Sequence, residues 1–417
     1  MKKKGLIISI IILVLFILLG FVLINNYITN KKIKEEKELV QNIESHYNEY
    51  VITNKETKLY KKENDKYIEN GKINKSIKLN LADLKISTDT KYFYINELDS
   101  YIYFEDLEKI EEYKKSDRYK KYIYFNENIT TNNITSFYDK DDKLLYTLNK
   151  SFDFMVLVKD TDRYGVIFND ELVYIHNYDV KEIYDNKNTD LTNKSRIRTL
   201  TYHFLYDENY EECNQWICLS LQKFREQLNY LKENNYLTLT MEELEMYMDG
   251  KINIPENSVV LTIDDATIFN TYAITLLEEY EVNATIFVIT SINKDFDYLK
   301  SEYLDLESHS ENMHVQYACP GYGSQGGGIL CLPEETVLED LRISQEKIGG
   351  SKYFAYPFYD YSNRAIELLK KAGFHMAFIG QSDTDGYSYP GITDKFKLRR
   401  KTIFSSITMN EFISFTK

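Results

Sequence analysis

The stretch Val259-Val260-Leu261-Thr262-Ile263-Asp264-Asp265 places an apolar run directly before two carboxylates. An uncharged, mainly aliphatic run of this length is typical of a strand that is buried on both faces of a parallel sheet. In such sheets, ligands and reacting groups gather beyond the carboxyl ends of the strands. We therefore expect Asp264 and Asp265 to lie at that end of a buried strand.

The same alternation of strand and helix patterns continues on both sides of this stretch. Apolar runs predict further strands, and periodic runs predict helices between them: strands at 199–205, 284–290, 303–306, 353–357 and 376–380, and helices at 219–234, 333–348 and 362–373. Thr240 and Glu243 have the spacing of a capping box, which predicts a helix that ends at Gly250. Repeated β/α units over about 220 residues predict an α/β domain at 197–417, with a parallel sheet or barrel.

The segment before this domain has a different pattern, with short alternating runs that are typical of strands. The run DTKYFYINELDSYIYFEDLEKI from Asp89 is echoed by DTDRYGVIFNDELVYIHNYDVKEI from Asp160, with a repeat period of about 70 to 80 residues. The two copies, at 35–112 and 113–185, resemble tandem bacterial SH3-like modules. This resemblance implies either binding to a cell wall or polysaccharide, or a stalk. A polar linker is expected at 186–196.

An uncharged apolar run extends from Gly5 to Ile24 near the N-terminus. As a helix with a rise of about 1.5 Å per residue, it would span a hydrocarbon core about 30 Å thick. No small-x-small cleavage site follows it, so we expect an uncleaved single-pass anchor within 1–34 instead of a signal peptide. The tight lysine cluster at 2–4 favours an N-terminus inside the cell and a translocated body. The expected location is the cell membrane, with the α/β domain extracellular.

The charge balance of the chain excludes some classes of partner. Its 417 residues carry 65 acidic and 51 basic side chains, a net charge of −14, although residues 1–34 hold six lysines and no acid. Such an acidic body makes nucleic acid an improbable partner and favours cationic ones. With 43% hydrophobic residues and only 16 Gly and 5 Pro, the chain is expected to be folded and not disordered.

Two histidines and two aspartates follow successive expected strands. Adjacent carboxylates on an extended backbone point in different directions, so one of Asp264 and Asp265 can bind a metal while its neighbour serves as a base. His309 and His314 are five residues apart, a spacing that would not share a helix face but can converge across a turn. One carboxylate and two imidazoles leave positions open for water, which suits a hydrolytic metal.

Three motifs resemble those of the polysaccharide deacetylase family, the carbohydrate esterases with a NodB-like domain. They are LTIDDA at 261–266, SHSENMH at 308–314 and FAYPF at 354–358. The histidine spacing and the FAYP form look most like the branch that deacetylates poly-β-1,6-N-acetylglucosamine. The resemblance covers residues 197–417 and implies a deformed (β/α)7 barrel.

The resemblance also implies a role for particular residues. Asp265, His309 and His314 would hold one divalent ion, most often Zn²⁺, and Asp264 would be the catalytic base. The backbone N–H near Phe358 would help to hold the oxyanion of the tetrahedral intermediate.

Several positions depart from the family pattern. Ala266 and Tyr359 stand where relatives have glycine, and both substitutions would narrow the groove. Ala355 stands where many relatives have an arginine, so Arg400, in KLRRKTI, is the candidate for orienting Asp264. The usual late histidine acid is missing, which leaves Asp264 itself or water to protonate the leaving group.

The four cysteines lack a C-x-x-C zinc spacing, so we expect either disulfides in an oxidising compartment or free thiols. The expected pairs are Cys213–Cys218 and Cys319–Cys331, each bracketing a loop beside the groove. Trp216, within the first loop, either stacks on sugar or covers a core edge. His203, on the first expected strand of the α/β domain, is either a core histidine or a neighbour of the site.

The expected function is metal-dependent deacetylation of N-acetylglucosamine units in an extracellular or cell-wall polysaccharide, either poly-N-acetylglucosamine or peptidoglycan. This reaction hydrolyses a C–N bond other than a peptide bond. The alternative is an impaired wall-binding or glycan-binding protein that uses the β repeats and a degenerate barrel.

Overall fold

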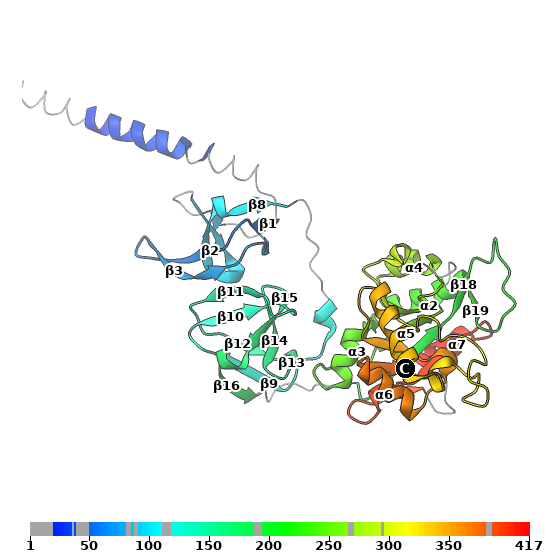
Figure 1. The fold of residues 1–417 in the computed structure, drawn as a ribbon. Coiled ribbons are helices and arrows are strands. Elements are labelled where there is room, and N and C mark those ends of the chain that lie inside the picture. The colour runs from blue at the N-terminus through cyan, green and yellow to red at the C-terminus, as the bar shows by residue number, and fades with distance from the viewer. Residues whose placement is uncertain are drawn as a thin grey trace, which may run out of the picture. The chain divides into compact units, whose positions relative to one another are not determined.

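The computed structural model describes residues 20–35, 37–38, 50–80, 85–86, 91–110, 118–186, 194–265, 271–292, 296–380 and 386–417. These divide into two compact units. The β unit comprises Met1–Ser116, Asn128–Phe154 and Asp162–Tyr184, and the barrel unit comprises Asp117–Glu127, Met155–Thr161 and Asp185–Lys417. Figure 1 draws both, with the β unit in blue to green and most of the barrel unit in green to red.

The barrel unit is built on a sheet of parallel strands in the order β25-β24-β23-β22-β21-β17, with β27 parallel to β17 on the other side. The strands are β17 (Ile197–Tyr202), β21 (Ser258–Asp264), β22 (Ala284–Val288), β23 (Leu304–Ser308), β24 (Tyr353–Ala355), β25 (Met376–Phe378) and β27 (Arg400–Thr402). A parallel bridge from Phe378 to Leu398, just before β27, joins the two ends of the sheet. The α/β class is thus confirmed, with a barrel of the (β/α) type.

Helices cover the outside of this sheet, and polar caps fix where several of them begin. They are α2 (Leu221–Glu233), α3 (Met241–Met248), α4 (Thr271–Tyr280), α5 (Glu334–Lys347), α6 (Asn363–Lys371) and α7 (Met409–Thr416). The expected capping box is confirmed, because the Glu243 N–H donates to Thr240 Oγ1 and the Thr240 N–H donates to Glu243 Oε2. The hydroxyl of Ser362 caps α6 in a similar way.

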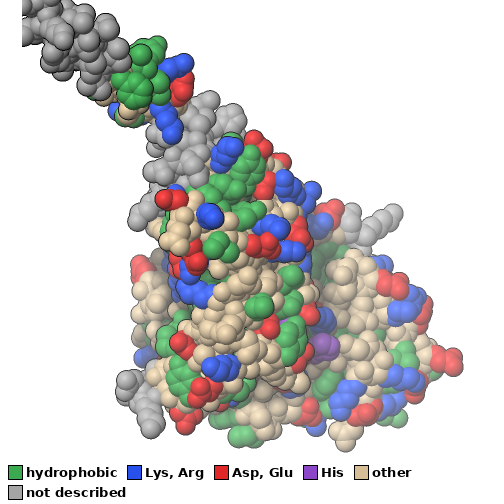
Figure 2. Space-filling model, turned by 90° about the vertical axis from the view of Figure 1, so that its left-hand side faces the viewer, with side chains coloured by type: hydrophobic (Ala, Val, Ile, Leu, Met, Phe, Trp, Pro, Cys, Tyr) green, Lys and Arg blue, Asp and Glu red, His purple; other side chains and the backbone are tan. Residues whose placement is uncertain are grey.

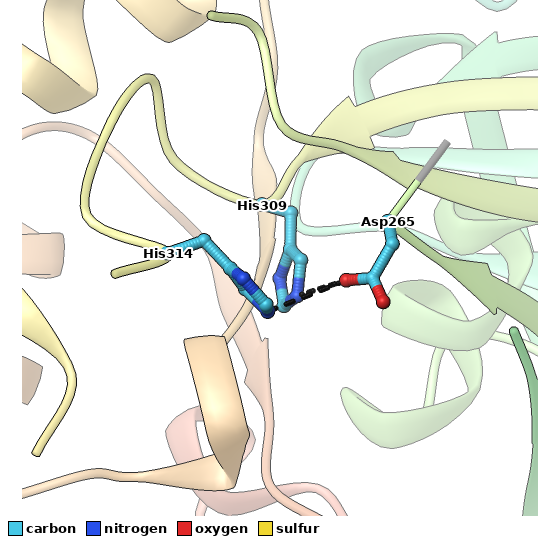
Figure 3. A group of neighbouring side chains, drawn as sticks. All are labelled: Asp265, His309 and His314. Carbon is cyan, nitrogen blue, oxygen red and sulfur yellow. Dashed lines mark ion pairs between the residues drawn. The ribbon is translucent and has the colours of Figure 1, made fainter. Parts of the chain in front are cut away.

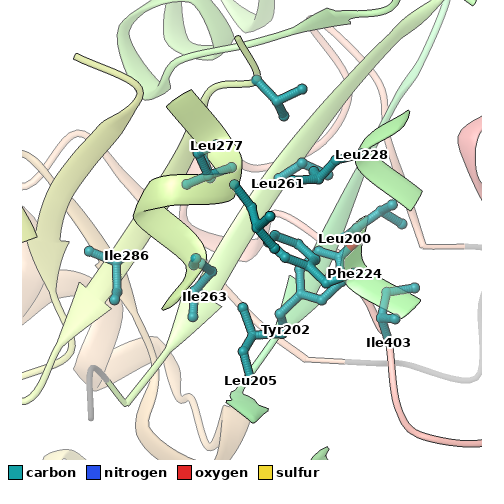
Figure 4. Close-up of a cluster of buried hydrophobic side chains, with 14 of the residues drawn as sticks. Leu200, Tyr202, Leu205, Phe224, Leu228, Leu261, Ile263, Leu277, Ile286 and Ile403 are labelled. Atoms are coloured by element: carbon teal, nitrogen blue, oxygen red, sulfur yellow. The ribbon is translucent and has the colours of Figure 1, made fainter. Parts of the chain in front are cut away.

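Side chains of β17 and β21 alternate between two environments, the layer under the helices and the inside of the barrel. Leu200 and Tyr202, with Leu261 and Ile263, face outward and pack on α2 and α4, where Phe224, Leu228 and Leu277 complete an apolar cluster (Figure 4). The intervening residues face into the barrel, where Thr201 and Thr262 hydrogen-bond through their hydroxyls at 3.0 Å. Because Asp264 has the same parity as Thr262, its side chain also belongs to the barrel interior.

The β unit is made of antiparallel strands. One sheet runs β14-β15-β10-β11-β3-β2-β7-β6-β5, and β4-β1-β8 and β12-β9-β16 form two smaller sheets. Its strands are β1 (Tyr50–Thr53), β2 (Thr57–Glu63), β3 (Lys66–Ile73), β4 (Lys78–Asn80), β5 (Lys85–Ile86), β6 (Tyr92–Ile95), β7 (Ser100–Tyr103), β8 (Leu107–Lys109), β9 (Glu127–Thr131), β10 (Thr135–Tyr138), β11 (Leu144–Leu148), β12 (Asp153–Met155), β14 (Arg163–Phe168), β15 (Glu171–His176) and β16 (Val180–Asp185). The strand-rich character expected for this region is present, but its likeness to SH3 modules is not confirmed.

The two halves of the β unit join edge to edge through β3 and β11. At this junction Gly71 adopts φ of 150°, and a Cβ there would lie 2.1 Å from the carbonyl oxygen of Thr147. Glycine is therefore required by the close approach of the two strands. Tyrosines occupy the half-buried face of neighbouring strands, and Tyr67 stacks on Tyr92 with ring centroids 4.2 Å apart. The abundant tyrosine thus covers one face of a sheet in this unit.

Two segments inside the expected second repeat belong to the barrel unit, namely Asp117–Glu127 and Met155–Thr161. Arg118 forms an ion pair with Glu243, which is 7% exposed, and donates to Asn283 Oδ1 at 3.0 Å. The Tyr122 hydroxyl donates to the same carboxylate at 2.6 Å. These contacts attach the segment to the start of α3.

Residues 20–35 are helical, but no helix among the described residues combines the length and apolar composition needed to cross a bilayer. Most of the expected anchor from Gly5 to Ile24 lies outside the described residues, so the anchor stays a prediction. On the face drawn in Figure 2, acidic and basic side chains are interspersed.

Replacing Arg118 with alanine should lower the free energy of unfolding of the barrel unit by about 3 kcal/mol, because the buried Glu243 carboxylate would lose its cation. The fluorescence of Trp216, the single tryptophan, can follow denaturant-induced unfolding of this unit. R342A is the control, since the ion pairs of Arg342 among the described residues are with exposed carboxylates on its own helix. Equal effects of R118A and R342A would contradict the prediction.

Candidate active site

The carboxyl ends of the parallel strands surround one pocket of about 400 Å³. Asp264 ends β21, while His203, His309 and Pro357 follow β17, β23 and β24 at short distance. Parallel strands bring these ends to one rim, as expected from the sequence. The pocket is lined by His203, Trp216, Ile217, Asp264, Asp265, His309, His314, Ser324, Gln325, Tyr356, Phe358 and Tyr359.

Asp265, His309 and His314 converge on one point of this pocket (Figure 3). The Nε2 atoms of His309 and His314 lie 3.4 and 3.3 Å from Oδ1 of Asp265. One ligand atom from each residue can be chosen so that all three lie within 4.8 Å of one another. The structure therefore brings together the three residues that the family resemblance implied as ligands.

Each of the two imidazoles can present an unprotonated nitrogen to a cation. Nδ1 of His309 lies 2.7 Å from the carbonyl oxygen of Ala355, which only accepts, so Nδ1 donates and Nε2 directs its lone pair into the site. Burial and the neighbouring His309 lower the pKa of His314 to about 4, so its ring is neutral at pH 7. Both rings can thus act as ligands.

The carboxylate completes the fit to a divalent ion. Oδ1 of Asp265 is buried and accepts no hydrogen bond from any described residue, although two imidazole nitrogens face it. Burial would raise the pKa of Asp265, but His309 and His314 lower it overall, so the carboxylate is charged. One carboxylate oxygen and two imidazole nitrogens at 3.4 and 3.3 Å from it form a donor set of the kind that binds a divalent cation. The residues present therefore fit one divalent ion.

Asp264 has a different partner from its neighbour. Arg400 donates from Nη1 to Oδ1 at 2.7 Å and from Nη2 to Oδ2 at 2.8 Å, and both side chains are essentially fully buried. Burial would raise the pKa of Asp264, but Arg400 lowers it overall, so Asp264 is ionised. The adjacent carboxylates thus point to separate partners, one to a guanidinium and one to two imidazoles. Their catalytic roles stay predictions.

The third motif forms a tight turn of left-handed backbone. Phe358 and Tyr359 have φ of 57° and 62°, a region that non-glycine residues rarely occupy. The Phe358 ring packs against His314 with centroids 4.2 Å apart, so this residue borders the expected metal site. The oxyanion role of its N–H stays a prediction. Ala266 lies outside the described residues.

His203 is the site residue that the sequence left undecided. Its Nε2 lies 4.0 Å from Oδ2 of Asp264 and 3.3 Å from the hydroxyl of Tyr359. The sequence could not place His203 at the site because it does not show the order of the strands. In the structure β17 pairs with β21 so that Tyr202 is opposite Ile263, and the residues that follow these two in the chain are His203 and Asp264. His375, the last histidine, instead pairs with Glu245 at 3.0 Å on the exterior.

Both expected disulfides are present, Cys213–Cys218 and Cys319–Cys331. Trp216, in the first loop, is 64% exposed and borders the pocket, and its ring meets that of Phe404 edge to face with centroids 5.9 Å apart. It is therefore neither a core residue nor remote from the site.

Asp360 anchors the glycine-rich loop inside the second disulfide. Its carboxylate is 5% exposed and accepts from the N–H groups of Ser324, Gln325 and Gly327 at 2.6, 3.0 and 3.2 Å. A Cβ at Gly323 would lie 2.4 Å from this carboxylate, so glycine is required there. Since Ser324 and Gln325 line the pocket, Asp360 determines the position of one pocket wall.

A family model described as polysaccharide deacetylase matches residues 251–377. This match confirms the family expected from the three motifs and supports a deacetylase hydrolase. No curated protein matches the chain.

Several solved structures match part of the chain. A de-N-acetylase from Aggregatibacter actinomycetemcomitans shares 19% identity at a TM-score of 0.45, covering 53% of this chain and 99% of its own. A polysaccharide deacetylase from Bacillus cereus shares 18% identity at 0.44, covering 73% and 93%. IcaB from Ammonifex degensii shares 19% at 0.41, covering 54% and 98%.

Loading the purified chain with a divalent metal should give about one equivalent, and His314→Ala should lower this occupancy because it removes one of three ligands. Elemental analysis after desalting measures the metal content. H375A is the matched control, since this exposed histidine lies outside the pocket. Undiminished metal in H314A would contradict the ligand assignment.

Replacing Asp360 with asparagine should release the loop, because an amide NH₂ would face backbone N–H groups that now donate to a carboxylate. Hydrogen exchange of residues 323–327 should become faster, and the melting temperature should fall. D297N, on an exposed 3₁₀ turn, should change neither. Unchanged exchange in D360N would show that the disulfide alone holds the loop.

Proposed function

Because residues 251–377 belong to the polysaccharide deacetylase family, we propose that this chain removes acetyl groups from N-acetylglucosamine units of a polysaccharide with the help of one divalent ion. The observation that carries the proposal is the joint geometry of two sets of side chains. Asp265, His309 and His314 converge on one point, and the adjacent Asp264 is held by Arg400 in the same pocket.

The reaction joins a water oxygen to the acetamide carbonyl carbon and breaks the bond from that carbon to nitrogen. Acetate leaves as an anion, and both protons of the water end on the nitrogen, which becomes an ammonium group. A divalent ion held by Asp265, His309 and His314 would supply Lewis-acid chemistry to the water and the carbonyl. The borderline nitrogen and oxygen donor set suits Zn²⁺, which we propose as the ion.

In this mechanism Asp264 is the general base. Arg400 uses two donors and keeps the carboxylate ionised and fixed in orientation, while a carboxylate has further lone pairs available to accept a proton from water. The position of Asp264 beside Asp265 in the chain brings the base next to the proposed ion. The N–H of Phe358 is proposed to donate to the developing oxyanion.

His203 is the proposed proton donor for the leaving amine. Burial is the main cause of its lowered pKa, so the imidazole is neutral at pH 7 before the reaction and can take up a proton. Nε2 lies 4.0 Å from Oδ2 of Asp264, so the proposed donor is near the proposed base although the two atoms are not hydrogen-bonded. His203 thus replaces the late histidine that the sequence lacks, and Asp264 need not act as both base and acid.

The proposed substrate is extracellular poly-N-acetylglucosamine or peptidoglycan. Trp216, exposed at the pocket rim, offers a ring face for a neighbouring sugar. Deacetylation creates a cationic amine, which a chain with a net charge of −14 would attract. A cell-membrane location with the barrel unit outside is proposed from the apolar run at 5–24 of the sequence. The alternative of an impaired glycan-binding protein is disfavoured because the proposed ligands and base are all in one pocket.

Purified full-length protein loaded with Zn²⁺ should release acetate from β-1,6-linked or β-1,4-linked N-acetylglucosamine oligomers or from peptidoglycan. Asp264→Asn should lower the rate by about 10²-fold or more at unchanged metal content, because it removes the general base. Asp265→Asn should instead lower metal content, and D297N serves as a control. The proposal is wrong if the metal-loaded protein releases no acetate from any of these substrates.

A further inference from the structure

Tyr359 occupies a position that favours glycine, yet it has a large side chain turned into the site. Its φ of 62° follows another left-handed residue, Phe358, and this backbone is unfavourable for residues with a Cβ. Asp360, next in the chain, is anchored by three backbone N–H groups of the facing loop, which holds the turn in place. A strained residue that the surrounding structure maintains at an active site suggests a functional reason.

The ring of Tyr359 packs directly against the backbone of Gly380. A Cβ on Gly380 would lie 2.1 Å from Cγ of Tyr359, so only glycine can stand beneath the ring at 380. The Arg400 guanidinium lies 5.4 Å from the ring centroid and holds Asp264 with its donors. The ring of Tyr359 therefore lies between Gly380 and the ion pair of Asp264 with Arg400.

The hydroxyl of Tyr359 lies between two polar atoms. Nε2 of His203 is 3.3 Å away, and Oγ1 of Thr402 is 3.4 Å away. Burial raises the pKa of Tyr359 to about 12, so the hydroxyl keeps its proton at neutral pH. It can then donate one hydrogen bond and accept others at the same time.

We propose that Tyr359 is a positioning residue whose hydroxyl holds His203 beside Asp264 in both protonation states of the imidazole. When Nε2 is unprotonated, the hydroxyl donates to it. When Nε2 carries a proton, the hydroxyl accepts from it and turns its own hydrogen to Thr402. A side chain that can only donate or only accept would lose its hydrogen bond to the imidazole in one of the two protonation states. The inference rests on the proposed role of His203 in deacetylation.

The kinetic test removes the hydroxyl and keeps the ring. Y359F should lower kcat about 3- to 10-fold, the effect of one lost hydrogen bond, with KM and metal content unchanged. In an H203Q background, Y359F should have no further effect, because the group that Tyr359 positions is absent. Y236F is the matched control, since this buried tyrosine hydroxyl bonds Thr416 and lies outside the pocket.

A second test is independent of activity. In metal-free protein, the ring nitrogen resonances of His203, assigned with H203Q, should shift in Y359F while those of His309 stay in place. Equal Y359F effects on kcat with and without His203, or unchanged His203 resonances, would overturn the proposal. A raised KM at constant kcat would also overturn it and assign Tyr359 to substrate fit. If wild-type protein releases no acetate, the proposed function fails, and the resonance shift still decides whether Tyr359 holds His203.

Discussion

The barrel unit depends on one buried pair of opposite charges, Asp264 and Arg400. Two charges that are fully removed from water cost several kcal/mol each unless their geometry is good, and here two parallel hydrogen bonds of 2.7 and 2.8 Å provide it. Asp264 ends β21 and Arg400 begins β27, and both strands pair with β17 between them. The pair forms only when β27 has closed against β17, so closure of the barrel supplies the cation that keeps the buried carboxylate of Asp264 ionised.

Asp264 and Asp265 are adjacent in the chain but have different partners. Asp264 follows the alternation of β21 into the barrel, whereas Asp265 has φ of 75° and leaves the strand. That single change of direction turns the second carboxylate toward His309 and His314. Tyr359 also has left-handed backbone, and its turn brings a hydroxyl to His203. Left-handed residues in the turns that follow β21 and β24 thus direct two of the pocket side chains.

Much of the fold was accessible from local patterns. The strand at 259–263, the capping box of Thr240 and Glu243, and the helix after Ser362 were all expected, because each depends on neighbours a few residues apart. The attachment of Arg118 to Glu243 was not expected. Its partner lies 125 residues away, and no local pattern in an otherwise β-rich segment marks it.

For the site, the sequence by itself determined the chemical types: two adjacent carboxylates, two histidines five apart and a late arginine, each recognisable because motif residues are close in the chain. It left His203 undecided between core and site, and it anticipated only a narrower groove from Tyr359. Both assignments needed the order of strands, since β17 lies beside β21 although 55 residues separate Tyr202 from Ser258. Hydrogen bonds and ion pairs act over a few ångströms in space, and only the closed barrel brings the ends of its strands within that distance.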